Sequence, residues 1–328
     1  MQAIVWKSYN LPKKALILEA VEKPSPKKDE ILVKIQAASI NSWDWDLVRG
    51  EPKILRIFTG IFKPSSPKVV GCDFAGIVES KGTEVNSINL GDVVFGDSSG
   101  CGFSAFAEYI CVKESVVAAK SINSKLKFEN LAAIPQAGVL ALQGLSKGGP
   151  ISQGDKILIN GGGGGVGTFA IQICKSFGAE VTGVDSGDKL AIMSAVGADH
   201  VIDYKAQDFT TNGLVYDRIL DMVAKRSRNE IKRSLVPRGS YVAIGGSLIT
   251  LALVAITNKL SASKQRMTVL AHKPNVEDML TLQKMIDGGK ISPVIDQVYK
   301  LNEAADAIQY LGDGLVKGKV ILSINSNP

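Results

Sequence analysis

The chain has 328 residues, of which 45% are hydrophobic and 21% are charged, and its formal net charge is +6. This length accommodates two domains with separate cores, and the composition excludes a disordered or fibrous protein. Because basic and acidic residues are interspersed along the chain, the surplus of positive charge indicates no nucleic acid partner.

The first 124 residues are expected to form a β-rich domain, because short strands follow one another with Pro, Gly and charged turns between them and without helices. The expected strands are Ala3–Trp6, Ile31–Ala37, Phe74–Val78, Asp92–Gly96 and Tyr109–Val112. The polar stretch Lys120–Leu126 marks the expected domain boundary. Helices are expected at Phe128–Ala133 and Gly138–Leu145.

The cysteines and the N-terminus favour a reducing compartment. The four cysteines are Cys72, Cys101, Cys111 and Cys174, and they include no C-x-x-C pair. The sequence starts with an expected strand rather than with a basic and then apolar leader. We therefore expect reduced thiols in a cytoplasmic protein.

A glycine-rich turn follows a short apolar strand at Ile157–Ile159 and opens an amphipathic helix. Three of its glycines fit the pattern G-x-G-x-x-G. The first permits a tight turn, the second lets the backbone approach a pyrophosphate, and the third lets the helix pack closely on the strand. The N–H groups and the dipole of the helix start would hold the phosphates. The candidate cofactor contacts of this turn are Gly162, Gly164, Gly165, Val166 and Gly167.

The next expected strand, Glu180–Val184, ends at Asp185, which lies 18 residues after Gly167. This is close to the spacing at which a dinucleotide-binding domain places an acid on the adenosine ribose. A carboxylate accepts a hydrogen bond from a 2′-hydroxyl and repels a 2′-phosphate, so Asp185 favours NADH. Lys189 lies near enough to reach a phosphate, and NADPH stays open as the alternative.

Further strands are expected at His200–Asp203, Arg218–Asp221, Tyr241–Ile244 and Met267–Leu270, with helical stretches between most of them. Strands that alternate with helices form a parallel sheet covered on both faces, so residues 125–272 are expected to be a doubly wound α/β domain. A helix at Val276–Asp287, a strand at Gln297–Leu301, a helix at Ala304–Leu311 and a strand at Lys319–Ile324 complete the expected elements.

One segment, Leu248–Ile256, is almost wholly apolar. It is too short for stable membrane insertion, because a spanning helix needs roughly 20 residues. The expected alternatives are a buried helix, the wall of an apolar pocket or a subunit contact, and the last of these favours a homodimer. A peripheral membrane contact is not favoured.

With these elements placed, six stretches carry a family resemblance. They are Ala38–Asn41, Gly71–Val78, Asn89–Gly96, Phe106–Tyr109, Ile159–Tyr204 and Lys317–Leu322. In their order and spacing the chain resembles the medium-chain dehydrogenase/reductase superfamily, and most of all its zinc-independent quinone oxidoreductase (zeta-crystallin-like) branch.

The resemblance implies a GroES-like catalytic domain at residues 1–124, completed by residues 273–328, and a Rossmann domain at residues 125–272, with the active cleft between them. It also implies that Tyr204 contacts the adenosine end of the cofactor, and that NADPH is common in this branch.

The resemblance also bears on zinc, which needs three ligands from Cys, His and carboxylate side chains at a catalytic site. Asn41, Cys72 and Pro135–Gly138 take the places of the ligands in the zinc enzymes of the superfamily. They offer one thiol and no imidazole. The two histidines, His200 and His272, fall at Rossmann strands. We therefore expect no metal site.

Without a metal the chain has no strong Lewis acid, whereas quinones and enones delocalise an incoming hydride charge themselves. We therefore expect an NAD(P)H-dependent reductase of a quinone or an α,β-unsaturated carbonyl. The alternatives are an enoyl-thioester reductase and a non-catalytic zeta-crystallin-like binding protein.

Candidate substrate contacts are less sharply indicated. Asn41 is a candidate hydrogen-bond donor to the substrate carbonyl or to the nicotinamide ribose, and a simple turn role is equally open. Asp44 is expected to be a cap or a surface charge rather than a proton donor. The aromatic residues expected to line an apolar substrate pocket are Trp43, Phe58, Phe62 and Phe103.

Overall fold

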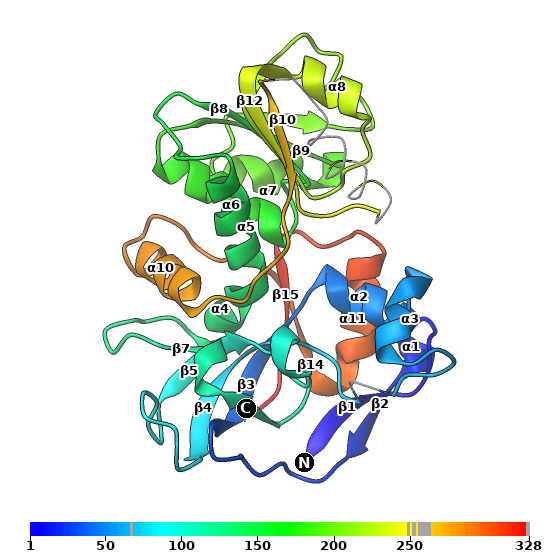
Figure 1. Ribbon diagram of the computed structural model, residues 1–328, viewed down its shortest axis with the longest axis vertical. Coiled ribbons are helices and arrows are strands. Elements are labelled where there is room, and N and C mark those ends of the chain that lie inside the picture. The colour runs from blue at the N-terminus through cyan, green and yellow to red at the C-terminus, as the bar shows by residue number, and fades with distance from the viewer. Residues whose placement is uncertain (66–67, 248–249, 251–253, 255–263, 326–328) are drawn as a thin grey trace. The chain divides into compact units, whose positions relative to one another are not determined.

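The computed structural model describes residues 1–65, 68–247, 250, 254 and 264–325 (Figure 1). The chain divides into two compact units. The β-rich unit comprises Met1–Gln136, Pro274–Asp287 and Ile295–Pro328, and the Rossmann unit comprises Ala137–Lys273 and Gly288–Val294. The boundary predicted after residue 124 stays a prediction of domain organisation.

The β-rich unit is built on an antiparallel hairpin and a larger, mostly antiparallel sheet. The hairpin consists of β1 (Gln2–Trp6) and β2 (Leu16–Ala20). The larger sheet contains β3 (Glu30–Ile40), β4 (Asp73–Lys81), β5 (Val93–Asp97), β6 (Tyr109–Lys113), β7 (Val117–Ala119), β14 (Ile295–Lys300) and β15 (Lys319–Ser323). Its order is β14-β15-β3-β4-β5-β7, with β6 also paired to β3. The late strand β15 is antiparallel to β3, so residues far apart in the sequence share one sheet.

Short helices surround this sheet. They are α1 (Pro12–Ala15), α2 (Ser42–Arg49), α3 (Arg56–Thr59), α4 (Phe128–Ala133), α10 (Val276–Asp287) and α11 (Ala304–Gly312), with 3-10 turns at Lys53–Leu55, Ser99–Cys101, Glu114–Val116 and Leu301–Glu303. Figure 1 shows α1, α2, α3 and α11 grouped at one side of the unit. The core between helices and sheet is apolar and includes Trp6, Phe74, Phe106 and Ile308.

Helix α2 departs from the sequence prediction, which placed no helix in the first 124 residues. Strand β3 runs on to Ile40, and Asn41 then becomes the N-cap of α2. The backbone N–H of Asn41 donates to Asp44 Oδ2 at 2.8 Å, which is one half of a capping box. Gly50 ends the helix with a φ of 62°, a left-handed conformation that glycine adopts without strain.

The Rossmann unit has a six-stranded sheet in which all neighbours are parallel. The strands are β8 (Lys156–Asn160), β9 (Glu180–Asp185), β10 (His200–Asp203), β11 (Tyr216–Asp221), β12 (Leu235–Ala243) and β13 (Arg266–Val269). Their order is β10-β9-β8-β11-β12-β13, the doubly wound arrangement that the sequence predicts. The predicted α/β fold class is therefore confirmed.

The helices of this unit follow the strands as expected. They are α5 (Pro135–Lys147), which begins two residues before the unit, α6 (Gly165–Ser176), α7 (Leu190–Ala195) after a 3-10 turn at Gly187–Lys189, and α8 (Arg228–Arg233). Strand β12 begins at Leu235, six residues earlier than predicted. Pro237 and Gly239 lie within it, and both residue types weaken the sequence pattern of a strand.

The apolar run Leu248–Ile256 lies outside the described residues, apart from Thr250 and Val254. The homodimer that was expected from it therefore stays a prediction. Among the residues with described positions, no helix has both the length and the apolar character needed to cross a bilayer.

Candidate functional site

The glycine turn between β8 and α6 is held tightly by the neighbouring strand. The N–H groups of Gly161 and Gly162 both donate to the carbonyl of Val184 on β9, at 2.8 and 3.0 Å. Gly161 has a φ of 92°, which glycine tolerates and other residues rarely adopt. The turn therefore reverses the chain at the carboxyl end of the sheet and points the start of α6 toward that end.

The two later glycines of the motif have different physical roles. A Cβ atom on Gly167 would lie 2.2 Å from the carbonyl oxygen of Gly161, so the helix packs on the turn only with glycine there. A Cβ atom on Gly164 would meet only the Gly161 oxygen, at 3.7 Å. The face at Gly164 is thus open to an approaching ligand. The first N–H groups of α6, at Gly165 and Val166, face no intrahelical acceptor and suit an anion.

The acid at the end of β9 is joined to this turn. Asp185 Oδ2 accepts a hydrogen bond from Gly163 N at 3.0 Å, and Lys189 Nζ lies 3.8 Å from Asp185 Oδ1. Both side chains are largely buried. Tyr204 follows β10 and donates its backbone N–H to the carbonyl of Asp185 at 3.1 Å, while its ring is exposed. The structure thus brings together all the residues that were predicted to hold a dinucleotide, and their binding role stays a prediction.

A buried hydrogen-bond network at the carboxyl ends of the central strands was not predicted. The carboxylate of Asp221, at the end of β11, is fully buried. It accepts hydrogen bonds from Asn160 Nδ2 at 2.7 Å, Ala224 N at 2.8 Å and Tyr241 OH at 3.0 Å. Burial and the nearby Asp221 raise the pKa of the Tyr241 phenol. These bonds tie β8, β11 and β12 together behind the glycine turn. The sequence does contain a signal for this network, because each of two apolar strands ends in a polar residue, Asn160 in β8 and Asp221 in β11.

In the β-rich unit, Asn41 belongs to a cluster of buried polar side chains. Its Nδ2 donates to Asp73 Oδ2 at 2.9 Å and to Cys72 Sγ at 3.5 Å, and its Oδ1 accepts from Lys319 Nζ at 2.6 Å. Lys319 Nζ also lies 3.7 Å from Asp73 Oδ2. Gln136 Nε2 adds a donor to Cys72 Sγ at 3.7 Å. Both amide hydrogens of Asn41 already donate hydrogen bonds, to Asp73 and to Cys72. Asn41 could therefore donate to a substrate only after one of these two hydrogen bonds breaks.

Burial controls the charges in this cluster. It raises the pKa of the Cys72 thiol well above the usual value, so the sulfur keeps its proton at neutral pH. It also raises the pKa of Asp73, and the ammonium group of Lys319 acts in the opposite direction. The carboxyl of Asp44 has its pKa raised to about 7, mainly by burial. Asp44 is the helix cap that was expected, and the alternative of a surface charge is wrong because the residue is fully buried.

Within the described part of the chain, one group of potential metal ligands is close enough to share an ion. Atoms of Cys72, Asp73 and Asp97 lie within 4.8 Å of one another. The Lys319 ammonium already balances the Asp73 charge, and the Asn41 amide directs its hydrogens at both the sulfur and the carboxylate. A zinc ion would have to displace the Lys319 ammonium and the Asn41 amide hydrogens and remove the thiol proton, so this donor set fits zinc poorly.

The aromatic residues predicted to line a substrate pocket have different environments. Trp43, Phe58 and Phe62 are exposed. Phe103 packs against the apolar core of the β-rich unit and has a φ of 64°. Their role in a pocket stays a prediction.

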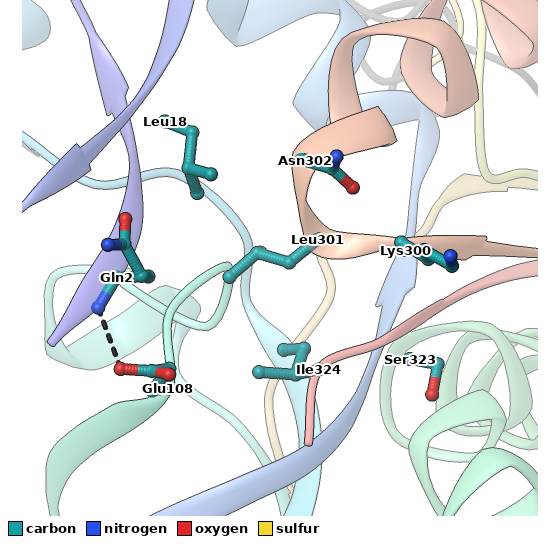
Figure 2. Close-up of a pocket in the computed structure, with 8 residues that line it drawn as sticks. All are labelled: Gln2, Leu18, Glu108, Lys300, Leu301, Asn302, Ser323 and Ile324. Carbon is teal, nitrogen blue, oxygen red and sulfur yellow. Dashed lines mark hydrogen bonds between the residues drawn. The ribbon is translucent and has the colours of Figure 1, made fainter. Parts of the chain in front are cut away.

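A pocket of about 380 Å³ lies within the β-rich unit. Figure 2 shows the apolar side chains of Leu18, Leu301 and Ile324 that line it. At its edge the backbone N–H of Gln2 donates to Glu108 Oε2 at 2.7 Å. None of the residues predicted from the sequence lines this pocket. It is therefore not the predicted substrate site.

Comparison with known proteins identifies the family. A model described as alcohol dehydrogenase GroES-like domain matches residues 27–121, and one described as zinc-binding dehydrogenase matches residues 196–322. A solved quinone oxidoreductase from Coxiella burnetii is similar with a TM-score of 0.88 and 30% identity, covering 99% of both chains. The 2-methylene-furan-3-one reductase of Solanum lycopersicum is 34% identical over 91% of this chain and 73% of its own. The chain belongs to the medium-chain dehydrogenase/reductase superfamily.

Two further members of the superfamily bear on its branch and its location. A chloroplastic quinone-oxidoreductase homolog of Spinacia oleracea is 29% identical over 98% of both chains. A chloroplastic NADPH-dependent alkenal/one oxidoreductase of Arabidopsis thaliana is 30% identical over 91% of this chain and 73% of its own. The predicted resemblance to the quinone oxidoreductase branch is confirmed. The predicted cytoplasmic location is wrong, because these related proteins are chloroplastic. Cysteine usage indicates a reducing environment and does not separate the cytoplasm from other reducing compartments.

Proposed function

We propose that this member of the superfamily transfers a hydride from a nicotinamide coenzyme to a quinone or an α,β-unsaturated carbonyl, without zinc. The observation that carries the proposal is the hydrogen bond from Gly163 N in the glycine turn to Asp185, together with the open space beside Gly164. The predicted enzyme class agrees with the quinone and enone reductases to which the chain is similar.

The chain's own residues would hold the coenzyme at the carboxyl ends of β8, β9 and β10. The N–H groups at the start of α6 would bind the pyrophosphate, because they combine free donors with the positive end of the helix dipole. Asp185 would accept hydrogen bonds from the adenosine ribose, and the exposed ring of Tyr204 would lie against the adenine. The bound nicotinamide supplies the hydride.

NADH is the coenzyme that this site favours. The ribose hydroxyls can donate to Asp185 while its ion pair with Lys189 stays intact. A 2′-phosphate would draw Lys189 away from Asp185 and then face a carboxylate with no counter-charge. The related alkenal/one oxidoreductase of Arabidopsis thaliana is NADPH-dependent by name, which supports NADPH as the alternative. A direct comparison of the two coenzymes decides between them.

The proposal of zinc independence rests on the buried cluster around Lys319. Its ammonium group already supplies the positive charge that Asp73 needs, with no requirement for an ion. The proposed acceptors also need no Lewis acid of the strength required to form an alkoxide, because a quinone or enone spreads the incoming charge over its own conjugated system.

Steady-state oxidation of NADH and NADPH tests the reaction. The acceptors are a water-soluble benzoquinone, a short-chain enone and an acyl-thioester enoate, and a simple alcohol with the oxidised coenzyme tests the reverse reaction. We expect turnover of the quinone or the enone that persists after treatment with a chelator. Dominant activity on the thioester would assign the enoyl-thioester alternative. No turnover of any acceptor, or alcohol oxidation that the chelator abolishes, would contradict the proposal.

The coenzyme preference is tested with Asp185→Ser. We expect the ratio of kcat/KM for NADH to that for NADPH to fall by at least about tenfold, since the repelling and accepting carboxylate is removed. The matched control is Asp217→Ser, which removes an exposed carboxylate near the amino end of β11, at the opposite end of the same sheet. A wild type that strongly prefers NADPH, or equal changes in both variants, would refute the assigned role of Asp185.

A further inference from the structure

The segment from Ile54 to Phe62 carries large apolar side chains on its outside. Relative exposure is 50% for Ile54, 67% for Ile57, 79% for Phe58, 65% for Ile61 and 95% for Phe62. Scattered apolar side chains are normal on a protein surface, whereas five large ones within nine residues form a concentrated apolar surface.

The polar side of this segment holds it to the β-rich unit. Thr59 is buried, and its hydroxyl lies 2.7 Å from the hydroxyl of Tyr9. Arg56 Nε donates to the carbonyl of Gly50 at 3.0 Å, and its guanidinium lies over the Tyr9 ring at 4.5 Å. An ordinary surface helix buries its apolar stripe and exposes its polar one. Here the arrangement is reversed, so the apolar residues are held outward by the contacts of their polar neighbours.

The charges next to this apolar surface are mainly positive. Between residues 49 and 68 the chain has five basic residues and one acidic residue. The basic side chains of Lys53, Lys63 and Lys68 are exposed. The single acid, Glu51, has its Oε1 3.8 Å from Arg56. The segment therefore presents bulky apolar side chains flanked by three exposed lysines.

This combination selects one class of partner. Apolar and aromatic side chains flanked by lysines bind the interface of an anionic bilayer, where the side chains enter the headgroup region and the lysines meet lipid phosphates. A symmetric contact between two copies of this chain would instead place the same basic segment against itself, which like-charge repulsion opposes.

We propose that the Ile54–Phe62 segment docks this protein on the surface of a membrane that contains anionic lipids. Phe58, Phe62, Ile57 and Ile61 enter the interface, and Lys53, Lys63 and Lys68 contact the phosphates. The contact is peripheral and reversible. It does not depend on the proposed reaction, because binding to vesicles requires neither coenzyme nor turnover.

Co-sedimentation of the full chain with lipid vesicles tests the proposal. One set of vesicles is pure phosphatidylcholine, and the other contains about one-third phosphatidylglycerol. We expect binding to the anionic vesicles that weakens at an ionic strength of ~0.5 M, because salt screens the lysine contacts. Equal binding to both kinds of vesicle, or binding to neither, would overturn the proposal.

Two variants separate the apolar and the charged contributions. Phe58→Ser/Phe62→Ser replaces side chains that are already exposed, and we expect vesicle affinity to fall at least about tenfold. Lys53→Glu/Lys63→Glu is expected to lower it further, since each lysine near an anionic surface contributes about fivefold. The matched control is Ile122→Ser/Lys125→Glu, which changes an exposed apolar and an exposed basic residue elsewhere in the same unit. Equal losses in control and test variants would refute the assignment.

Two other outcomes would reassign the segment. If sedimentation velocity shows a dimer that Phe58→Ser/Phe62→Ser converts to a monomer, the segment is a contact between copies of the chain. If that variant binds vesicles like the wild type and loses turnover of a water-soluble quinone, the two aromatic residues line the substrate site. Either result would contradict membrane docking, and failure of the reaction alone would not.

Discussion

The buried carboxyl of Asp44 makes stability depend on pH in a direction that can be calculated. Its pKa in the folded protein is about 7, mainly because burial disfavours the charged form, whereas its ordinary value is 3.8. Below about pH 4 the carboxyl is protonated in both states. As pH rises from there to 7, the unfolded chain loses the proton and the folded protein keeps it. The free energy of unfolding therefore falls over this window.

The magnitude follows from the difference between the two values. A difference of about 3 pH units corresponds to about 4 kcal/mol, a large part of the stability of an ordinary domain. Asp44→Asn removes the titration and retains an oxygen that accepts from Asn41 N. We therefore expect the stability difference, variant minus wild type, to rise by about 4 kcal/mol between pH 4 and pH 7.5.

Urea unfolding followed by tryptophan fluorescence measures this difference. All three tryptophans, Trp6, Trp43 and Trp45, belong to the β-rich unit, so the signal reports the unit that contains Asp44. The matched control is Asp46→Asn on the same helix. Asp46 is less buried, and its pKa is raised only to about 6, so its effect should be smaller and should end at a lower pH. Parallel pH profiles for wild type and Asp44→Asn would refute the reasoning.

Two further predictions concern the buried lysine and the glycine turn. Lys319→Met leaves the Asp73 carboxylate without its cation, and we expect it to lower the free energy of unfolding at pH 8 by about 3–5 kcal/mol. Adding Asp73→Asn should restore part of that loss in the same urea experiment, and a double variant no more stable than the single one would contradict the pairing. Gly164→Ala should leave the Tm unchanged, because its Cβ would meet only one atom of the protein, at 3.7 Å. The same Cβ would obstruct the approach of the pyrophosphate, so NADH binding measured by calorimetry should weaken at least about tenfold. Gly167→Ala should lower the Tm, since its Cβ would lie 2.2 Å from Gly161 O, and wild-type NADH affinity in Gly164→Ala would refute the pyrophosphate assignment.

The parts of the molecule that could be predicted are those whose signals are local. The glycine turn and Asp185 belong to one βαβ unit, and the strand and helix periodicities between them predict that they lie close together. The same holds for most strands of the Rossmann unit, whose apolar runs are bounded by turn residues. The pair of Asn41 and Asp44 also carried a local signal, but the short strands and turns around it favoured a domain without helices, and α2 was missed.

The buried cluster was beyond sequence reasoning for a physical reason. Lys319 Nζ contacts Asn41 Oδ1 across 278 positions of the chain. No periodicity relates two such residues, and only the pairing of β15 with β3 brings them together. For Asn41 the residue type left a turn role and a donor role equally open. The structure shows that it occupies the N-cap position of α2, while its side chain links Lys319 to Cys72 and Asp73.

The position of β15 has a consequence for how the protein is made. Strand β3 leaves the ribosome early and β6 can soon pair with its Glu30–Lys34 part, yet the edge of its Ala37–Ile40 part has no partner until residues 319–323 are synthesised. Until then that edge exposes unpaired backbone groups, and the Asp73 carboxylate has no cation to accompany it into the interior. The β-rich unit therefore cannot finish folding during translation of its own N-terminal strands, whereas the Rossmann sheet has all its strands by Val269. We expect nascent chains of this protein to need protection of that edge by a chaperone for most of their synthesis.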